Sequence, residues 1–303
     1  MLYNFLSRFA NYNLEYVTTI LAESELLMDP AFVDRKTYQV GKESGIDFHE
    51  ERTRFFSEQD GYYKRSWVLN LDGGILNCPQ PLVPNTEVKF SFERVPATYS
   101  LFFTSTTETA PTALDNGKAV TINDAFLELE YVSSPYLRNL NASIIEKPLT
   151  YHYDDCQIYM KDVTKGSQSF RVNSLCGGLT PEYVFAGFLP SKCLDPDFVT
   201  TSLTFKDPGV REACITLNGA LVQGYPISAL TPDSMIQFYC RFMDTIGKTK
   251  LTSSAGSLSF YTFKEEFMLL SHRFEGEQSD EGWIGFDIKF SSPTTRDYTF
   301  GEI

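Results

Sequence analysis

The chain has little of what a metal site or a disulfide framework needs. It holds three histidines, and its six cysteines form no CxxC pair. Zinc sites draw on closely spaced Cys and His ligands, so no zinc site is expected. We expect free, mostly buried thiols in a reducing compartment instead. The cysteines are Cys78, Cys156, Cys176, Cys193, Cys214 and Cys240.

Long hydrophobic runs are also missing. No stretch approaches the roughly eighteen apolar residues that a membrane-spanning helix requires. Residues 1–16 contain one arginine and a short apolar stretch, without the long apolar region or the cleavage site of a signal peptide. We therefore expect no membrane span and no secretion, and we place the protein inside the cell where it is made.

Positive charge is scarce. The 26 Lys and Arg residues stand against 39 Asp and Glu residues, which gives a net charge of −13. Nucleic-acid binding depends mainly on Lys and Arg side chains that neutralise phosphates, so we expect no specific nucleic-acid partner. An acidic balance keeps a concentrated protein soluble through self-repulsion, and it makes assembly sensitive to salt.

Aromatic residues are abundant, at 15% of the chain with 25 Phe and 17 Tyr. Both types favour half-buried sheets. Residues 87–95 show the clearest two-residue period, with Val88, Phe90 and Phe92 on one face. Similar patterns predict about fourteen to sixteen short strands between loops rich in Pro, Gly, Ser, Thr and Asp. The predicted strands lie at residues 67–71, 87–95, 99–105, 119–122, 125–133, 156–163, 167–173, 182–190, 199–205, 212–227, 235–242, 257–263, 267–274 and 283–290.

The number of strands predicts the fold class. It exceeds one eight-stranded sandwich and matches two, and no long amphipathic helix separates the strands as a parallel sheet would require. Asn218-Gly219 between apolar runs predicts a hairpin with a tight primed turn. The expected fold is all-β, a tandem double jelly roll of two eight-stranded antiparallel sandwiches at residues 46–175 and 176–303. A short, partly helical N-terminal arm is expected at residues 1–45.

The three histidines fit the sequence pattern of a metal-binding triad. Either His49 with Glu51 or His152 with Asp154 could join His272 in a facial arrangement of two His and one carboxylate. The pattern is too short to be specific, because a carboxylate two residues after a histidine is common by chance in an acidic chain. We expect solvated carboxylates at these positions and no bound metal.

Nucleophiles and paired carboxylates give equally weak signals. No GxSxG elbow is present, and residues 174–178, Ser-Leu-Cys-Gly-Gly, are predicted to form a turn between strands or domains. Glu128 and Glu130 would share a strand face about 7 Å apart, which an outward polar face explains better than glycosidase chemistry. We therefore assign no catalytic, cofactor-binding or metal-binding residue and predict that the protein is not an enzyme.

Three ordered stretches stand out between residues 60 and 228. The first, residues 79–103, has a Leu-x-Pro-Asn turn that leads into an alternating strand. The second is residues 119–137 with a short continuation at 165–170, and the third runs from 185 to 227. In order and spacing they resemble the double jelly-roll major capsid proteins of Polinton or Maverick elements and their adintovirus-like relatives. Residues 257–290 resemble the closing strands. The matching positions are Leu82, Pro84, Asn85, Arg94, Gly166, Ser167, Phe170, Gly187, Leu189, Pro190, Phe205, Asn218, Gly219 and Pro226.

This resemblance implies a structural, hexon-like capsid subunit. Such a subunit forms homotrimeric, pseudo-hexameric capsomers, which contact neighbouring capsomers and a minor or penton protein in the virion capsid after assembly inside the host cell. Two alternatives stay open: a carbohydrate- or receptor-binding jelly-roll protein, and a minor or penton component of the same particle. Tyr62, Tyr63 and Tyr225 are candidate anchors of subunit contacts, and they suit the core equally well.

Overall fold

A computed structural model gives the fold for about the C-terminal half of the chain and for short pieces before it. The predicted N-terminal arm, residues 1–45, and most of the predicted first jelly roll lie outside the described residues. The described residues are 57–59, 62–64, 82–83, 86–92, 121–129, 150–153, 156–173, 177–178, 180–194, 205–229, 235–248, 260, 263–264, 267–274 and 282–302.

Four antiparallel strands form the first sheet. They are β3 (Tyr159–Val163), β6 (Tyr183–Pro190), β10 (Leu269–Arg273) and β12 (Tyr298–Glu302). Their spatial order is β10-β6-β12-β3, so β3 and β10 lie at its two edges. A short 3-10 helix, η4 (Ser191–Cys193), follows β6 directly.

The second sheet is built on β4 (Ser169–Val172), β11 (Gly282–Phe290) and β7 (Val210–Leu217). Its order is β4-β11-β7-β8, with β8 (Ala220–Leu221) and β9 (Ile227–Ser228) both on β7 and β5 (Gly177–Gly178) on β11. Because β8 and β9 pair with different residues of the same strand, they share one row of the sheet. The sheet therefore has a row of two short strands beside β7.

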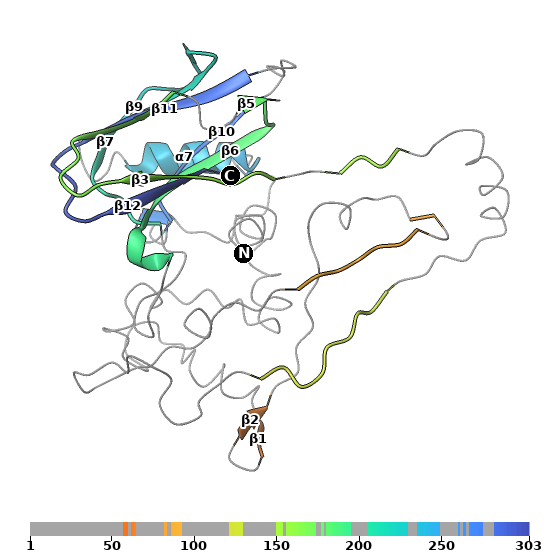
Figure 1. The fold of residues 1–303 in the computed structure, drawn as a ribbon. Coiled ribbons are helices and arrows are strands. Elements are labelled where there is room, and N and C mark those ends of the chain that lie inside the picture. Colours follow the sequence, from red (N-terminus) through yellow and green to blue (C-terminus); the bar gives the residue numbers. More distant parts are fainter. Residues whose placement is uncertain are drawn as a thin grey trace.

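The chain alternates between the two sheets. It passes from β3 to β4, returns to β6, crosses to β7, β8 and β9, and continues through β10, β11 and β12 in the same way. Figure 1 shows the resulting sandwich. The strands β3 and β4 lie before residue 176, where we expected the second domain to begin, and yet they pair with β12 and β11. This sandwich thus includes strands on both sides of the predicted boundary.

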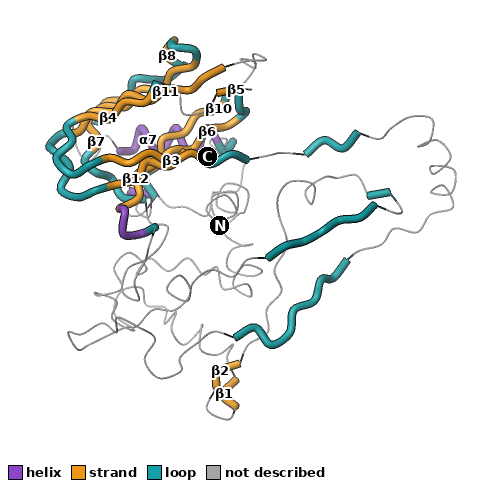
Figure 2. Tube along the Cα trace, viewed as in Figure 1, coloured by secondary structure: helices purple, strands orange, loops and turns teal. Residues whose placement is uncertain are grey.

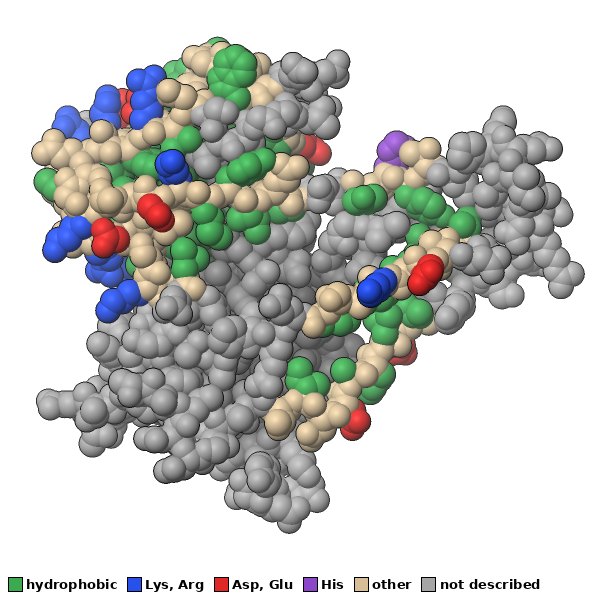
Figure 3. Space-filling model, in the orientation of Figure 1, with side chains coloured by type: hydrophobic (Ala, Val, Ile, Leu, Met, Phe, Trp, Pro, Cys, Tyr) green, Lys and Arg blue, Asp and Glu red, His purple; other side chains and the backbone are tan. Residues whose placement is uncertain are grey.

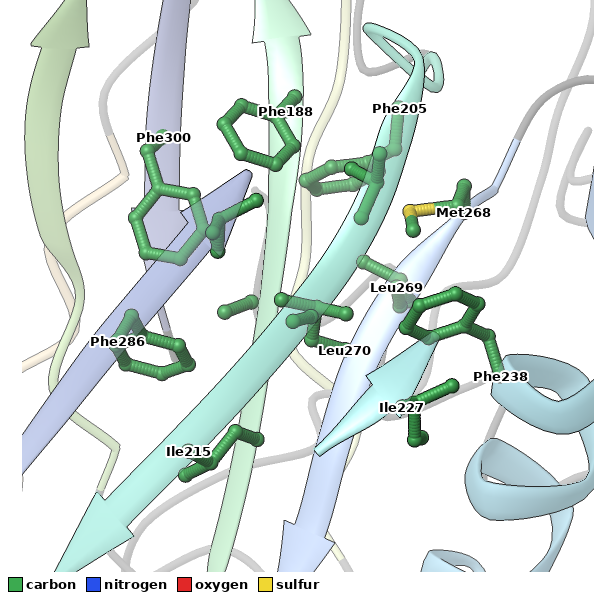
Figure 4. Packing of buried hydrophobic residues seen from close by; sticks show 14 of the residues in the cluster. Phe188, Phe205, Ile215, Ile227, Phe238, Met268, Leu269, Leu270, Phe286 and Phe300 are labelled. Carbon is green, nitrogen blue, oxygen red and sulfur yellow. The ribbon is translucent and has the colours of Figure 1, made fainter. Parts of the chain in front are cut away.

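The space between the sheets is filled mainly by phenylalanine rings. Measured between ring centroids, Phe300 of β12 lies 5.0 Å from Phe188 of β6 in the same sheet. It lies 5.1 Å from Phe286 of β11 in the second sheet. Phe170 of β4 closes the cluster at 4.9 Å from Phe300, and Figure 4 shows several of these packed side chains. Full burial of each ring contributes about 1.5–3 kcal/mol to folding, so this cluster holds the sheets together.

Helix α7 (Met235–Thr245) covers the outer face of the first sheet. Phe242 of α7 meets Phe185 of β6 at 6.1 Å, and Thr245 shares a hydrogen bond of 3.1 Å with Ser271 of β10. Figure 2 shows the helix beside these strands. The helix thus covers the outer face of β6 and β10, whereas β3 at the other edge of the sheet is largely exposed.

The predicted strand at 235–242 is wrong, because these residues form α7. Its buried residues are Met235, Phe238, Phe242 and Thr245, at spacings of three and four that bring one face of a helix onto the sheet. Phe260 and Phe263, which we placed in a strand at 257–263, are helical as well. Short apolar runs fit either a strand or a helix, and here the packing against the sheet decides between them.

The hairpin predicted at Asn218-Gly219 is confirmed. Asn218 has a φ of 52° and Gly219 a φ of 80°, and β7 continues through this turn into β8. Positive φ at both central residues is typical of a type I′ turn, which matches the twist of the flanking strands.

Glycine is also required at position 187 of β6, where a Cβ would lie 2.5 Å from the Phe205 ring.

Two segments with strand-like sequence form no strand. Residues 86–92 and 121–129 carry no strand assignment, and Phe92 and Phe126 are 73% and 91% exposed. The predictions for these residues are wrong because a strand also needs a neighbour for its backbone hydrogen bonds, and no described strand pairs with either segment. Earlier in the chain, β1 (Ser57–Gln59) and β2 (Tyr62–Lys64) form a small hairpin.

Candidate interaction surfaces

The described members of the candidate metal triad lie in different settings. His272 is buried on β10, with its ring 4.7 Å from Phe274 and 6.3 Å from Tyr225. His152 is exposed, and Asp154 lies outside the described residues, as do His49 and Glu51. In the part of the chain that the structure describes, no three His, Cys, Asp or Glu side chains are grouped to hold a metal ion. His272 therefore serves as a packed aromatic side chain.

Tyr225 belongs to the core and not to an exposed contact. It is 6% exposed, and its hydroxyl donates a hydrogen bond of 3.0 Å to the carbonyl oxygen of Ser271. Burial raises the pKa of Tyr225 well above its ordinary value. Tyr62 and Tyr63, the other two candidate anchors, lie in β2.

Four cysteines are described, and no disulfide links them to one another. Cys193 is buried, Cys156 and Cys214 are half-buried, and Cys240 is exposed. Burial and the nearby carboxylates of Glu212 and Asp287 raise the pKa of the Cys214 thiol. A thiol with a raised pKa is a poor nucleophile, so Cys214 is not suited to covalent catalysis.

Other sequence candidates bring no catalytic geometry. Gly177 and Gly178, predicted as part of a turn, instead form β5 and pair with β11, because β11 extends past β4 and offers them its free edge. Ser174, Cys176 and Glu130 lie outside the described residues, and Glu128 is exposed in an irregular segment.

The outward face of the second sheet is polar. Lys289 of β11 and Glu212 of β7 are cross-strand neighbours whose charged groups lie 2.9 Å apart. This hydrogen bond raises the pKa of Lys289. Exposed pairs of this kind contribute little to stability, so the face reads as a solvated surface.

One end of that polar face is apolar. Trp283 is 47% exposed and Leu221 is 49% exposed. Leu221 pairs with Thr216, and Thr216 pairs with Gly285, so these three residues face the same side of the sheet. Trp283 lies two residues before Gly285 on the same strand and therefore projects from that side as well. We call these two side chains the Trp283 patch.

The backbone holds the Trp283 patch in place. Asn218 donates a backbone hydrogen bond of 2.9 Å to the Trp283 carbonyl, and its side-chain oxygen accepts one of 2.9 Å from the Trp283 amide. A Cβ at Gly285 would lie 2.7 Å from Oγ1 of Thr216, so the Thr216 side chain leans over this glycine beside the indole. An exposed tryptophan on a strand with a fixed backbone suits a protein contact.

A shallow groove of about 420 Å³ separates α7 from β9. Arg241 lies across it, so close to Gly224 that a Cβ there would be 1.2 Å from Nη2 of the arginine. Asp244 pairs with Arg241 at 3.3 Å. The carboxylate of Asp244 is paired with Arg241 and no histidine lines the groove, so its Cys240 thiol has no positioned base there. Its lining residues are Gly224, Pro226, Ile227, Gln237, Cys240, Arg241 and Asp244.

Over the described residues, fold and surfaces together define an antiparallel β-sandwich that α7 covers on one side. No protein-family model matches the chain, and no curated protein matches it significantly. Among the described helices, none is long and apolar enough to cross a membrane.

Proposed function

We propose that the chain is a structural capsid subunit, a hexon-like major capsid protein of a Polinton- or Maverick-type virus or virus-derived element. The observation that carries the proposal is the order of the strands. If the rows of the sandwich are numbered along the chain, with β8 and β9 as one row, one sheet holds rows 1, 8, 3 and 6 and the other holds rows 2, 7, 4 and 5. That arrangement is the connectivity of a jelly roll, a fold that viral capsid proteins use.

The second part of the proposal is a tandem arrangement. We infer that the jelly roll of β3 to β12 is the C-terminal one and begins near residue 156, and that a first jelly roll precedes it after a short N-terminal arm. Support comes from the strand-like patterns before residue 156 and from the resemblance of residues 79–103 and 119–137 to the capsid family.

The third part concerns partners and location. Three copies would form a pseudo-hexameric capsomer, and capsomers would contact one another and a minor or penton protein in the virion capsid, assembled inside the host cell. The Trp283 patch supports this, since exposed tryptophan is enriched among the residues that dominate protein contacts. A closed, densely packed sandwich gives rigidity and surface, which are what a non-enzymatic shell protein requires.

The direct test is the oligomeric state of the purified full-length chain by mass photometry. We expect trimers and larger assemblies, and a strictly monomeric protein at micromolar concentration would contradict the proposal. Trp283→Ala should weaken assembly, because it removes the largest side chain of the Trp283 patch. It should leave the fold intact, because the side chain is exposed. Ile236→Ala is the matched control, since it removes a side chain of 50% exposure from α7.

The exposed indole also favours one second candidate, a carbohydrate-binding jelly-roll protein. A tryptophan fixed on a sheet face can stack against the apolar face of a sugar ring, and its indole N–H remains available as a donor. Saturable binding on a glycan array that is lost in Trp283→Ala, together with no assembly, would select this function over the capsid subunit.

A further inference from the structure

The outer strands of the two sheets differ in how their backbone edges are protected. In the first sheet, α7 packs on β10, and the Tyr225 hydroxyl donates a hydrogen bond of 3.0 Å to the carbonyl oxygen of Ser271 in that strand. In the second sheet, β8 and β9 have two residues each and β4 has four. The other outer strand of the first sheet, β3, has five. An exposed edge strand is a ready template for pairing with another chain, so β3 is the edge at which a further strand can be added.

Apolar side chains are exposed along β3. Met160 is 51% exposed, and Ile158, just before the strand, is 40% exposed. Met160 pairs with Gly301, whereas the next residue along β3 pairs with Phe300 of the core. Successive residues of a strand face opposite sides, so Met160 points away from the core, and so does Ile158 two residues earlier. Figure 3 shows hydrophobic side chains at the surface along the course that β3 follows in Figure 1. The border of the sheet is therefore an accessible, partly apolar strand.

The backbone of β3 is paired on one side. Among the strands that the structure describes, its only partner is β12. A side-chain contact adds to this pairing, since Asp162 accepts a hydrogen bond of 3.2 Å from Oγ1 of Thr299 in β12. On the other side of an edge strand, alternate N–H and C=O groups point away from the sheet. These groups are strong donors and acceptors, so β3 offers a fixed backbone ladder to an added strand.

We propose that β3 pairs with β3 of a second copy, antiparallel and about a two-fold axis, so that the first sheets of the two copies join. A second copy is the partner because an added strand must itself have a free edge, and β3 supplies one on every copy. Such a contact is isologous, with the same surface on both molecules. Since a two-fold contact cannot close a trimer, this one joins neighbouring capsomers. The inference rests on the proposed capsid subunit and adds a contact between capsomers to it.

The side chains of β3 select where the axis passes. In an antiparallel pair about a two-fold axis, the residue at the axis lies opposite its own copy. An axis at Lys161 or Asp162 would set like charges directly opposite each other, which is destabilising. An axis at Tyr159, the first residue of the strand, would leave most of β3 unpaired. An axis at Met160 sets two apolar side chains together and places Lys161 opposite Tyr159 of the second copy, where the ammonium can lie against the ring. The pairing is therefore centred on Met160.

The first test measures assembly of the full-length chain by sedimentation velocity. Met160→Glu places two carboxylates opposite each other at the axis and should weaken association between capsomers at least about tenfold. Met160→Lys should do the same, whereas an equimolar mixture of the two variants should associate like the wild type, because each pair then joins opposite charges. Recovery in the mixture also shows that both variants fold. Ile236→Glu is the matched control, since it introduces the same charge at a side chain of 50% exposure on α7, and it should resemble the wild type.

The second test measures the register by cross-linking. Directly opposite residues of an antiparallel pair have Cα atoms about 4.5–5.5 Å apart, a separation that a disulfide spans. Mild oxidation of Met160→Cys should therefore give a disulfide-linked dimer on a non-reducing gel. The wild type and Ile236→Cys are the controls, and they report any background from native thiols such as the exposed Cys240.

The outcomes separate this inference from the proposed function. Trimers that assemble further to the same extent in the wild type and in Met160→Glu, with no cross-link at position 160, overturn the edge pairing and leave the capsid subunit standing. Assembly that is lost in both charged variants and not restored in their mixture overturns the two-fold pairing and assigns the edge to a different strand. Dimers that Met160→Glu abolishes, in the absence of trimers, support the edge pairing and contradict the capsomer. A wild type that stays monomeric at micromolar concentration contradicts both.

Discussion

The two sheets of the sandwich bury their residues differently. In the second sheet, β11 buries Ile284, Phe286 and Ile288 against the core, while Trp283 and Lys289 face outward and are exposed. In the first sheet, Leu269, Leu270 and Ser271 follow one another in β10 and are all buried. The reason is α7, which covers the outer face of the first sheet. A side chain that points away from the space between the sheets is thus buried beneath α7 in the first sheet and exposed in the second.

The largest expected effect comes from the outward face of the first sheet. Leu269→Ala should lower the free energy of unfolding by about 2–5 kcal/mol, because the side chain is buried and leaves a cavity under α7. Urea denaturation followed by circular dichroism measures the change. Lys289→Ala on the outward face of the second sheet is the control and should leave the midpoint unchanged. Equal losses in both variants would contradict the comparison of the sheets.

A smaller effect is expected from filling space on the same covered face. Gly187→Ala should destabilise the protein by about 1–3 kcal/mol, since the new Cβ would lie 2.5 Å from the Phe205 ring and 2.8 Å from Leu269. Gly301→Ala on the neighbouring strand meets only Leu189, at 3.4 Å, and should be tolerated. Thermal melts of the two variants test this, and a Gly301→Ala that melts lower than Gly187→Ala would refute the packing described for this face.

The smallest effect concerns the turn at the end of the second sheet. Asn218→Ala should cost about 1 kcal/mol, because alanine disfavours the positive φ and removes the acceptor for the Trp283 amide. Asn218→Gly keeps the φ accessible and loses only the acceptor, so it should lie between Ala and the wild type. Chemical denaturation orders the three proteins, and a Gly variant weaker than the Ala variant would disprove the role of the turn conformation.

The sequence predicted the elements whose local signal agrees with their packing. The patterns at 156–163, 182–190 and 283–290 lie over β3, β6 and β11, and Asn218-Gly219 forms its predicted turn. β12 was missed, although Tyr298 and Phe300 alternate with smaller residues, because the segment is short and close to the last residue of the sequence.

Other features could not be read from local sequence at all. Val88, Phe90 and Phe92 alternate as regularly as the residues of β11, and still their segment forms no strand, because pairing depends on distant partners. The contact between the β3–β4 turn and the loop before β12 is also invisible along the chain, since Lys165 and Asp297 lie 132 positions apart and meet only through the topology. No prediction of a site from spacing could have joined them.

The row that β8 and β9 share beside β7 has a consequence for how copies can meet. A long, straight outer strand would let another chain extend the sheet by backbone pairing, with no limit to growth. Here that border consists of two strands of two residues each, interrupted by the turn at Gln223 and Gly224. Chain-to-chain stacking has no continuous ladder to follow on this side. On this side a second molecule could bind only through side-chain shape and charge, and not by extending the sheet through its backbone.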